Sequence, residues 1–168
     1  LTILAFVITA SGQLPPAFSQ GASPVVRESS LTRKYLSPVR IVHVFDSSGR
    51  MVKNQESILA EGNGQADLNS GTYLTLENSE EKAGAGIILD LGREIQGGVE
   101  IITTKNNLKP AGRVRIRFGE SVAETMSDTK ENGATNDHAM RDFIVTLPWL
   151  GKLETGESGF RFVRIDLI

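Results

Sequence analysis

Alternation of polar and apolar residues is clearest at Arg113–Phe118, where arginines alternate with Val114, Ile116 and Phe118. In an extended strand, successive side chains point to opposite faces. The pattern therefore predicts a half-buried β-strand with three apolar side chains on one face and three arginines on the other. The same reasoning places Val145, Val163 and Ile165 in the core.

Other segments also have strand-like patterns. Arg40–Phe45 is rich in β-branched residues and ends at the turn sequence Asp46–Gly49. Tyr73–Glu77 alternates in the same way, and Gly62–Gly71 before it has the composition of a loop. Further strands are expected at Ile87–Leu91, Val99–Thr103, Phe143–Leu147 and Phe160–Leu167, the first two forming a pair joined by the glycine-bearing segment Gly92–Gly98.

Many short strands without a helix-length period indicate an all-β fold. Seventeen glycines in a chain that is 6% aromatic also favour turns and short strands. We predict an antiparallel two-sheet β-sandwich over residues 35–168, with a β-barrel as the alternative. A single domain of this size buries enough surface to fold without crosslinks.

The N-terminal segment is predicted to be separate from this fold. Leu1–Ala10 is apolar and uncharged, and Ala17-Phe18-Ser19 has small residues at the positions that precede a signal-peptide cleavage site. We interpret residues 1–19 as a signal peptide that is N-terminally truncated, since it lacks a basic region and begins with leucine. Residues 20–34 are then a polar leader. An N-terminal core helix is the alternative, disfavoured by Pro15-Pro16.

A signal peptide implies export. The chain has no cysteine and no N-x-Ser/Thr sequon, which favours a bacterial periplasm or cell surface over a eukaryotic secretory product. A formal net charge of -2 argues against nucleic acid and anionic membrane as partners. At about 20 residues needed per span, no membrane span is predicted in the mature chain.

Catalytic and metal-binding patterns are weak. His43 and His138 are far apart and belong to no ligand motif, and Gly156–Gly159 lacks the spacing of a nucleophile elbow. Asp67–Gly71 resembles a calcium loop with its glycine one place early. Glu120 with Asp142 is one arbitrary pair among twenty acidic residues. We therefore predict no catalytic residue, no metal site and no cofactor.

Two groups of residues are candidates for binding. Arg113, Arg115 and Arg117 form a basic stripe that could meet an acidic partner or a uronic acid, although a solvated strand face is the simpler interpretation. The second group is the polar segment with Asn136, Asp137, His138 and Arg141, together with Trp149.

The polar segment could bind carbohydrate or stabilise the fold. Asn136, Asp137, His138 and Arg141 can hydrogen-bond sugar hydroxyls, or equally loop backbone groups or a neighbouring domain. Trp149 could stack on a sugar ring, but its neighbours Pro148 and Leu150 favour a packed side chain.

Several segments together resemble a known family. These are ILDLGREIQGGVEI at Ile88–Ile101, VRIRFGES at Val114–Ser121, NDHAMRDF at Asn136–Phe143, LPWLG at Leu147–Gly151 and GFRFVRIDL at Gly159–Leu167. They are similar to the N-terminal β-sandwich, of jelly-roll or galactose-binding-like type, in bacterial α-L-rhamnosidase-type enzymes of glycoside hydrolase family 78. The resemblance covers roughly Tyr35 to Ile168.

The resemblance implies a non-catalytic role for this chain. In that family the catalytic carboxylates lie on a C-terminal (α/α)₆ barrel, which would be the partner of this domain, so no catalytic residue carries over. The chain would be a fragment or an isolated accessory domain of an exported, inverting rhamnosidase-like enzyme acting on rhamnose-containing polysaccharide. The alternative is a stand-alone secreted carbohydrate-binding module or lectin.

Overall fold

The computed structural model describes residues 34–61, 71–78, 84–104, 111–128, 131 and 141–168. Residues Tyr35–Ile168 belong to one compact unit. Its strands are β1 (Arg40–Phe45), β2 (Val52–Lys53), β3 (Thr75–Leu76), β4 (Gly86–Thr103), β5 (Arg113–Gly119), β6 (Asp142–Thr146) and β7 (Gly151–Leu167). The described helices are a 3₁₀ helix, η2 (Gln55–Leu59), and one short α-helix, α1 (Val122–Met126).

The strands form two antiparallel sheets. The larger has the order β1-β4-β7-β5-β6, and the smaller pairs β2 with β3. The predicted antiparallel all-β fold is therefore confirmed. Strand β1 has the predicted bounds, whereas the alternation at Tyr73–Glu77 forms only the two-residue strand β3. The predicted loop Gly62–Gly71 lies outside the described residues except for Gly71.

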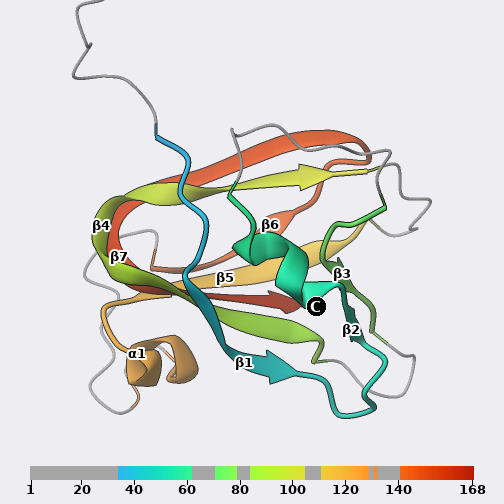
Figure 1. Ribbon diagram of the computed structural model, residues 1–168, viewed down its shortest axis with the longest axis horizontal. Coiled ribbons are helices and arrows are strands. Elements are labelled where there is room, and N and C mark those ends of the chain that lie inside the picture. The colour runs from blue at the N-terminus through green and yellow to red at the C-terminus, as the bar shows by residue number, and fades with distance from the viewer. Residues whose placement is uncertain (1–33, 62–70, 79–83, 105–110, 129–130, 132–140) are drawn as a thin grey trace, which may run out of the picture. The chain divides into compact units, whose positions relative to one another are not determined.

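The two-layer arrangement comes from a bend in β4 and β7. Gly86–Asp90 pairs with Phe162–Asp166, the register is interrupted, and Ile95–Thr103 then pairs with Gly151–Phe160. Both strands curve together at the left of Figure 1, so that the Ile95–Thr103 half of β4 and the Gly151–Phe160 half of β7 lie above β5 in this view. The prediction of two strands joined by a connection at Gly92–Gly98 was wrong, because the chain passes through these glycines as one continuous strand.

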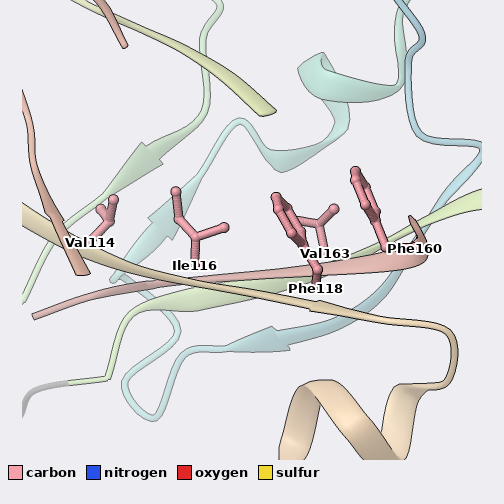
Figure 2. Packing of buried hydrophobic residues seen from close by; sticks show 5 residues of the cluster. All are labelled: Val114, Ile116, Phe118, Phe160 and Val163. Carbon is pink, nitrogen blue, oxygen red and sulfur yellow. The ribbon is translucent and has the colours of Figure 1, made fainter. Parts of the chain in front are cut away.

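The main core lies between the two layers. It consists of Val114, Ile116 and Phe118 from β5 and Phe160 and Val163 from β7. Figure 2 shows these five side chains standing on one side of the strands, with α1 on the other side. The rings of Phe118 and Phe160 stack with centroids 4.2 Å apart, and this contact joins β5 to the Gly151–Phe160 half of β7.

Most of the predicted core is buried. Val114, Ile116, Phe118 and Val163 are at most 3% exposed. Val145 and Ile165 pack against the same cluster, as their predicted place in the core requires, but they are only half-buried. For Val145 the reason is its position on β6, an edge strand with a neighbour on one side.

The predicted turn at Asp46–Gly49 is present and fixes the start of the smaller sheet. The Asp46 carboxylate accepts hydrogen bonds from the backbone N–H groups of Ser48, Arg50, Met51 and Val52. Desolvation raises the pKa of Asp46, but these four bonds together outweigh it and lower the pKa. Met51 and Val52 are then positioned to form a second small core with Ala85.

Candidate functional site

The face of the large sheet opposite the main core, here called the outer face, carries a row of alternating charges. Arg115 of β5 binds Asp142 of β6 with two bonds, Nε to Oδ1 at 2.8 Å and Nη2 to Oδ2 at 2.6 Å. Arg117 donates to Asp166 of β7 at 3.0 Å, and Arg164 donates to the same carboxylate at 2.9 Å. These bonds run across β6, β5 and β7, so they crosslink the sheet.

Asp128, just after α1, adds a third carboxylate to this charge network on the outer face. Its Oδ1 lies 2.6 Å from Nη2 of Arg115 and 3.5 Å from Nη1 of Arg117. Hydrogen bonding to Asp142 and Asp128 raises the pKa of Arg115, and the bond from Arg115 lowers the pKa of Asp128. Arg117 is 5% exposed, and its Nε has no partner among the described residues.

The prediction of a solvated arginine face therefore holds for Arg113, which is exposed, and was wrong for Arg115 and Arg117. Those two guanidinium groups are neutralised within the chain by Asp142, Asp128 and Asp166. An acidic partner or a uronic acid would have to displace these carboxylates to bind there.

Helix α1 is held over the outer face by its cap and by side-chain contacts. The Ser121 hydroxyl accepts from the Glu124 N–H, and Glu124 in turn accepts from the Glu120 N–H, a reciprocal arrangement close to a capping box. At the other end of the helix, Arg164 donates to the Met126 sulfur at 3.3 Å and lies over the Phe45 ring.

A second carboxylate, Asp90, is 1% exposed and lies at the bend of β4. Arg161 binds it with two bonds of 2.8 and 3.0 Å, Arg40 donates at 2.9 Å, and the Gly92 N–H donates at 2.7 Å. Hydrogen bonding from Arg161 holds the pKa of Asp90 far below its usual range, and the bonds from Gly92 and Arg40 add to this effect. Asp90 thus joins β1, β4 and β7 at the point where the sheet bends.

This chemistry is suited to structure rather than to proton transfer. A glycosidase acid must be protonated at working pH, which requires a raised pKa. The surroundings of Asp90 lower its pKa instead. Asp142, which was considered above as a possible partner of Glu120, accepts a hydrogen bond from Arg115 at each of its two oxygens. Within the described ranges, no group of three His, Cys, Asp or Glu side chains is arranged to hold a metal ion.

The predicted binding residues are partly outside the described structure. Asn136, Asp137 and His138 are not among the described residues, and neither is the calcium-like segment Asp67–Ser70. Arg141 is described; its side chain is 16% exposed, and its Nη2 lies 3.7 Å from Oε2 of Glu124.

Trp149 is 57% exposed, so the expectation that its ring is packed was wrong. It lies in the turn between β6 and β7, which is fixed by the Thr103 hydroxyl, 2.9 Å from the Pro148 oxygen and 3.3 Å from the Gly151 oxygen. Arg141 and Trp149 lie at opposite ends of β6, a strand of five residues that spans about 17 Å. One sugar ring could not contact both.

Sequence reasoning missed Asp90, Asp128 and Asp166 as partners of the arginines. A signal was present for two of them, because Asp90 stands within the otherwise apolar segment ILDL and Asp166 lies between Ile165 and Leu167. A carboxylate in such a segment must be paired when it is buried. Asp128 had no such signal, since it follows a short helix.

The described structure also contains a shallow open groove beside β1. It is lined by Tyr35, Leu36, Ser37, Pro38, Val39, Leu59 and Glu61. Ser37 donates to the Ala60 oxygen at 2.6 Å, which ties the segment before β1 to the end of η2. None of the described helices is long and apolar enough to cross a membrane.

Comparison with known proteins gives similarity at the level of structure. No family model matches the sequence, and no curated protein matches it. Among solved structures, the chain is similar to a rhamnosidase from Klebsiella oxytoca with rhamnose bound, with a TM-score of 0.44 and 12% sequence identity. The match covers 81% of this chain and 25% of that chain, so this chain spans about a quarter of the length of that structure.

Proposed function

We propose that this chain is the non-catalytic N-terminal accessory β-sandwich of an exported α-L-rhamnosidase-like glycoside hydrolase that acts on rhamnose-containing polysaccharide. Its partner would be the C-terminal (α/α)₆ catalytic domain of the same protein, and its location the periplasm or surface of a bacterium. The segments at Ile88–Ile101 and Gly159–Leu167, which resemble that family, and the signal-like residues 1–19 are the sequence support.

The observation that carries the proposal is the pairing of strand carboxylates with arginines. Asp90, Asp142 and Asp166 each bind one or more guanidinium groups from neighbouring strands. Such pairs fix strand positions and keep the carboxylates ionised. A domain that stabilises a neighbour needs this rigidity, whereas a hydrolytic site needs a protonated carboxylic acid beside an ionised one.

The proposal is tested by assaying two purified proteins on an aryl α-L-rhamnoside. The chain alone should release no aryl alcohol above the buffer rate, and the longer gene product should hydrolyse the substrate with inversion at the anomeric carbon. Turnover by the chain alone would contradict the accessory role. An inactive but folded longer product would contradict the rhamnosidase assignment.

A second candidate function, a carbohydrate-binding module, is favoured by the exposed Trp149 ring. Exposed aromatic rings in fixed turns are suitable stacking surfaces for sugars, and the Thr103 bonds hold this turn. In this alternative the chain would bind rhamnose-containing oligosaccharides without a catalytic domain.

Calorimetric titration of the chain with such oligosaccharides distinguishes the two functions. A binding module should show millimolar or tighter affinity that Trp149→Ala abolishes, while Tyr73→Ala, which removes another exposed aromatic ring, leaves it unchanged. Asp137→Ala should also weaken binding if the polar segment takes part. For an accessory domain we expect no measurable heat with any of these proteins.

A further inference from the structure

Strand β6 forms one edge of the large sheet, where β5 is its neighbour on one side. It pairs with β5 in a continuous register from Arg113↔Thr146 to Arg117↔Asp142, without a bulge. Two backbone hydrogen bonds, both 2.8 Å, join this segment to β5: Phe118 N–H donates to the Arg141 oxygen, and Leu147 N–H donates to the Gly112 oxygen. The backbone N–H and C=O groups of the odd-numbered residues of this segment therefore point toward β5. Alternate residues face the other way in an antiparallel strand, so Asp142, Ile144 and Thr146 direct their N–H and C=O groups away from β5.

These outward backbone groups have no strand partner in the part of the chain that the structure describes. Natural edge strands are usually protected by lysine, proline, a bulge or short length. In β6 the three central residues, Phe143, Ile144 and Val145, are all apolar. Among the described residues, the features that protect this edge are the five-residue length of β6 and Pro148, which cannot donate a hydrogen bond.

The side chains on both faces of β6 are also incompletely covered. Ile144 is 53% exposed on the outer face. Phe143 and Val145 point to the inner face, where they pack against the main core but stay half-buried. A strand added beside β6 would therefore cover apolar surface on both faces and pair the open backbone groups.

We propose that β6 is a self-association edge, which pairs antiparallel with β6 of a second copy of this chain about a two-fold axis at Ile144. In this register Ile144 faces Ile144 of the second copy, and Asp142 faces Thr146. Each of these facing residues directs its backbone groups to the shared edge, so each pair exchanges two hydrogen bonds. The proposal is independent of the rhamnosidase assignment.

Self-complementarity favours a second copy over an unrelated peptide. The central pair is β-branched on both sides, which suits a cross-strand contact. No like charges face each other, because the Asp142 carboxylate is already bound by Arg115 and its opposite residue is Thr146. Phe143 would lie beside Val145 of the second copy, which continues the main core across the axis.

Disulfide crosslinking tests the pairing directly, since the chain has no cysteine of its own. In the proposed register the two Cα atoms of residue 144 lie about 5.5 Å apart, within the range that a disulfide can bridge. Under mild oxidation Ile144→Cys should form a covalent dimer several-fold faster than the control Leu36→Cys, which alters a residue of similar exposure, 49%, away from β6. Equal rates for the two variants would overturn the proposal.

Sedimentation provides a second, non-covalent test. The chain should show a concentration-dependent monomer–dimer equilibrium that Ile144→Lys abolishes, because two lysines would then face each other at the axis. Leu36→Lys should leave the equilibrium unchanged, and circular dichroism should show both variants folded. A chain that stays monomeric at all concentrations, or a folded Ile144→Lys variant that still dimerises, would overturn the proposal. If Ile144→Lys fails to fold, the crosslinking rates decide.

Discussion

Asp90 is the most deeply buried of the carboxylates discussed above. Its carboxylate is buried, yet Arg161, Arg40 and the Gly92 N–H together satisfy both oxygens. The side chains of Arg161 and Arg40 remain 39% and 62% exposed, so water helps to solvate their charges. Burial of the anion is tolerated because each of its oxygens has a donor.

Replacement of Asp90 by asparagine should lower the free energy of unfolding by about 2–3 kcal/mol at pH 7, because it replaces charge-assisted bonds by neutral ones and points an amide donor at a guanidinium donor. Chemical denaturation measures this difference. The folded-state pKa of Asp90 lies below the unfolded value, so its stabilisation is complete above about pH 4–5 and is lost as the pH falls through the folded-state pKa. The gap between the two proteins should therefore shrink in acid, and a gap that is constant down to pH 2 would contradict this account.

Replacement of Ile116 by alanine should cost about 2–5 kcal/mol of unfolding free energy, because the side chain is fully buried and leaves a cavity in the main core. Ile144→Ala makes the same chemical change at a residue that is 53% exposed, and should cost under about 1 kcal/mol. Urea denaturation of both variants gives the comparison. Similar losses of unfolding free energy at the two positions would contradict the burial of Ile116 in the main core.

At the residue level, alternation predicted which way the β5 side chains point but not what they meet. Val114, Ile116 and Phe118 are buried as predicted. Arg115 is neutralised in part by Asp128, which is 13 residues away in the sequence, and Arg117 by Asp166, which is 49 residues away. Local periodicity carries no information about contacts made across that separation.

At the level of elements, the bend in β4 and β7 decides the architecture. Gly92 adopts a positive φ of 78°, and a Cβ at Gly98 would overlap the carbonyl oxygens of Thr155 and Gly156. Both glycines therefore have roles that a larger residue could not fill without strain. Glycines usually signal a turn between strands, which is why the sequence pattern favoured two strands here; in this chain they allow one strand to bend.

Gly98→Ala should lower the free energy of unfolding by about 2–4 kcal/mol, since the new methyl group would separate β4 from β7. Gly97→Ala is the matched control: its Cβ would meet only the end of the Ile95 side chain at 3.6 Å, so we expect a change within about 1 kcal/mol. Thermal or chemical unfolding of the two neighbours measures the effect. Equal stability of the two variants would contradict the close strand approach at the bend.

For the whole molecule, the fold class could be predicted and the arrangement of layers could not. Strands β1 and β5 follow from local patterns, because period-two alternation and β-branched residues are local properties. The β1-β4-β7-β5-β6 order depends on pairings between distant segments, such as Ile95 with Phe160. Of the candidate site residues, Trp149 was identified from the sequence, but its exposure depends on the turn that Thr103 fixes.

The proposed accessory role depends on the paired carboxylates being structural. The most direct test introduces Asp142→Asn or Asp166→Asn into the longer enzyme proposed above and measures its kcat for aryl α-L-rhamnoside hydrolysis, at a temperature where circular dichroism shows each variant folded. We predict a kcat within about two-fold of the unchanged enzyme, with a lower melting temperature, because these groups hold strands together. A fall in kcat of about 100-fold or more in a folded variant, the size expected for loss of a general acid or base, would contradict the account.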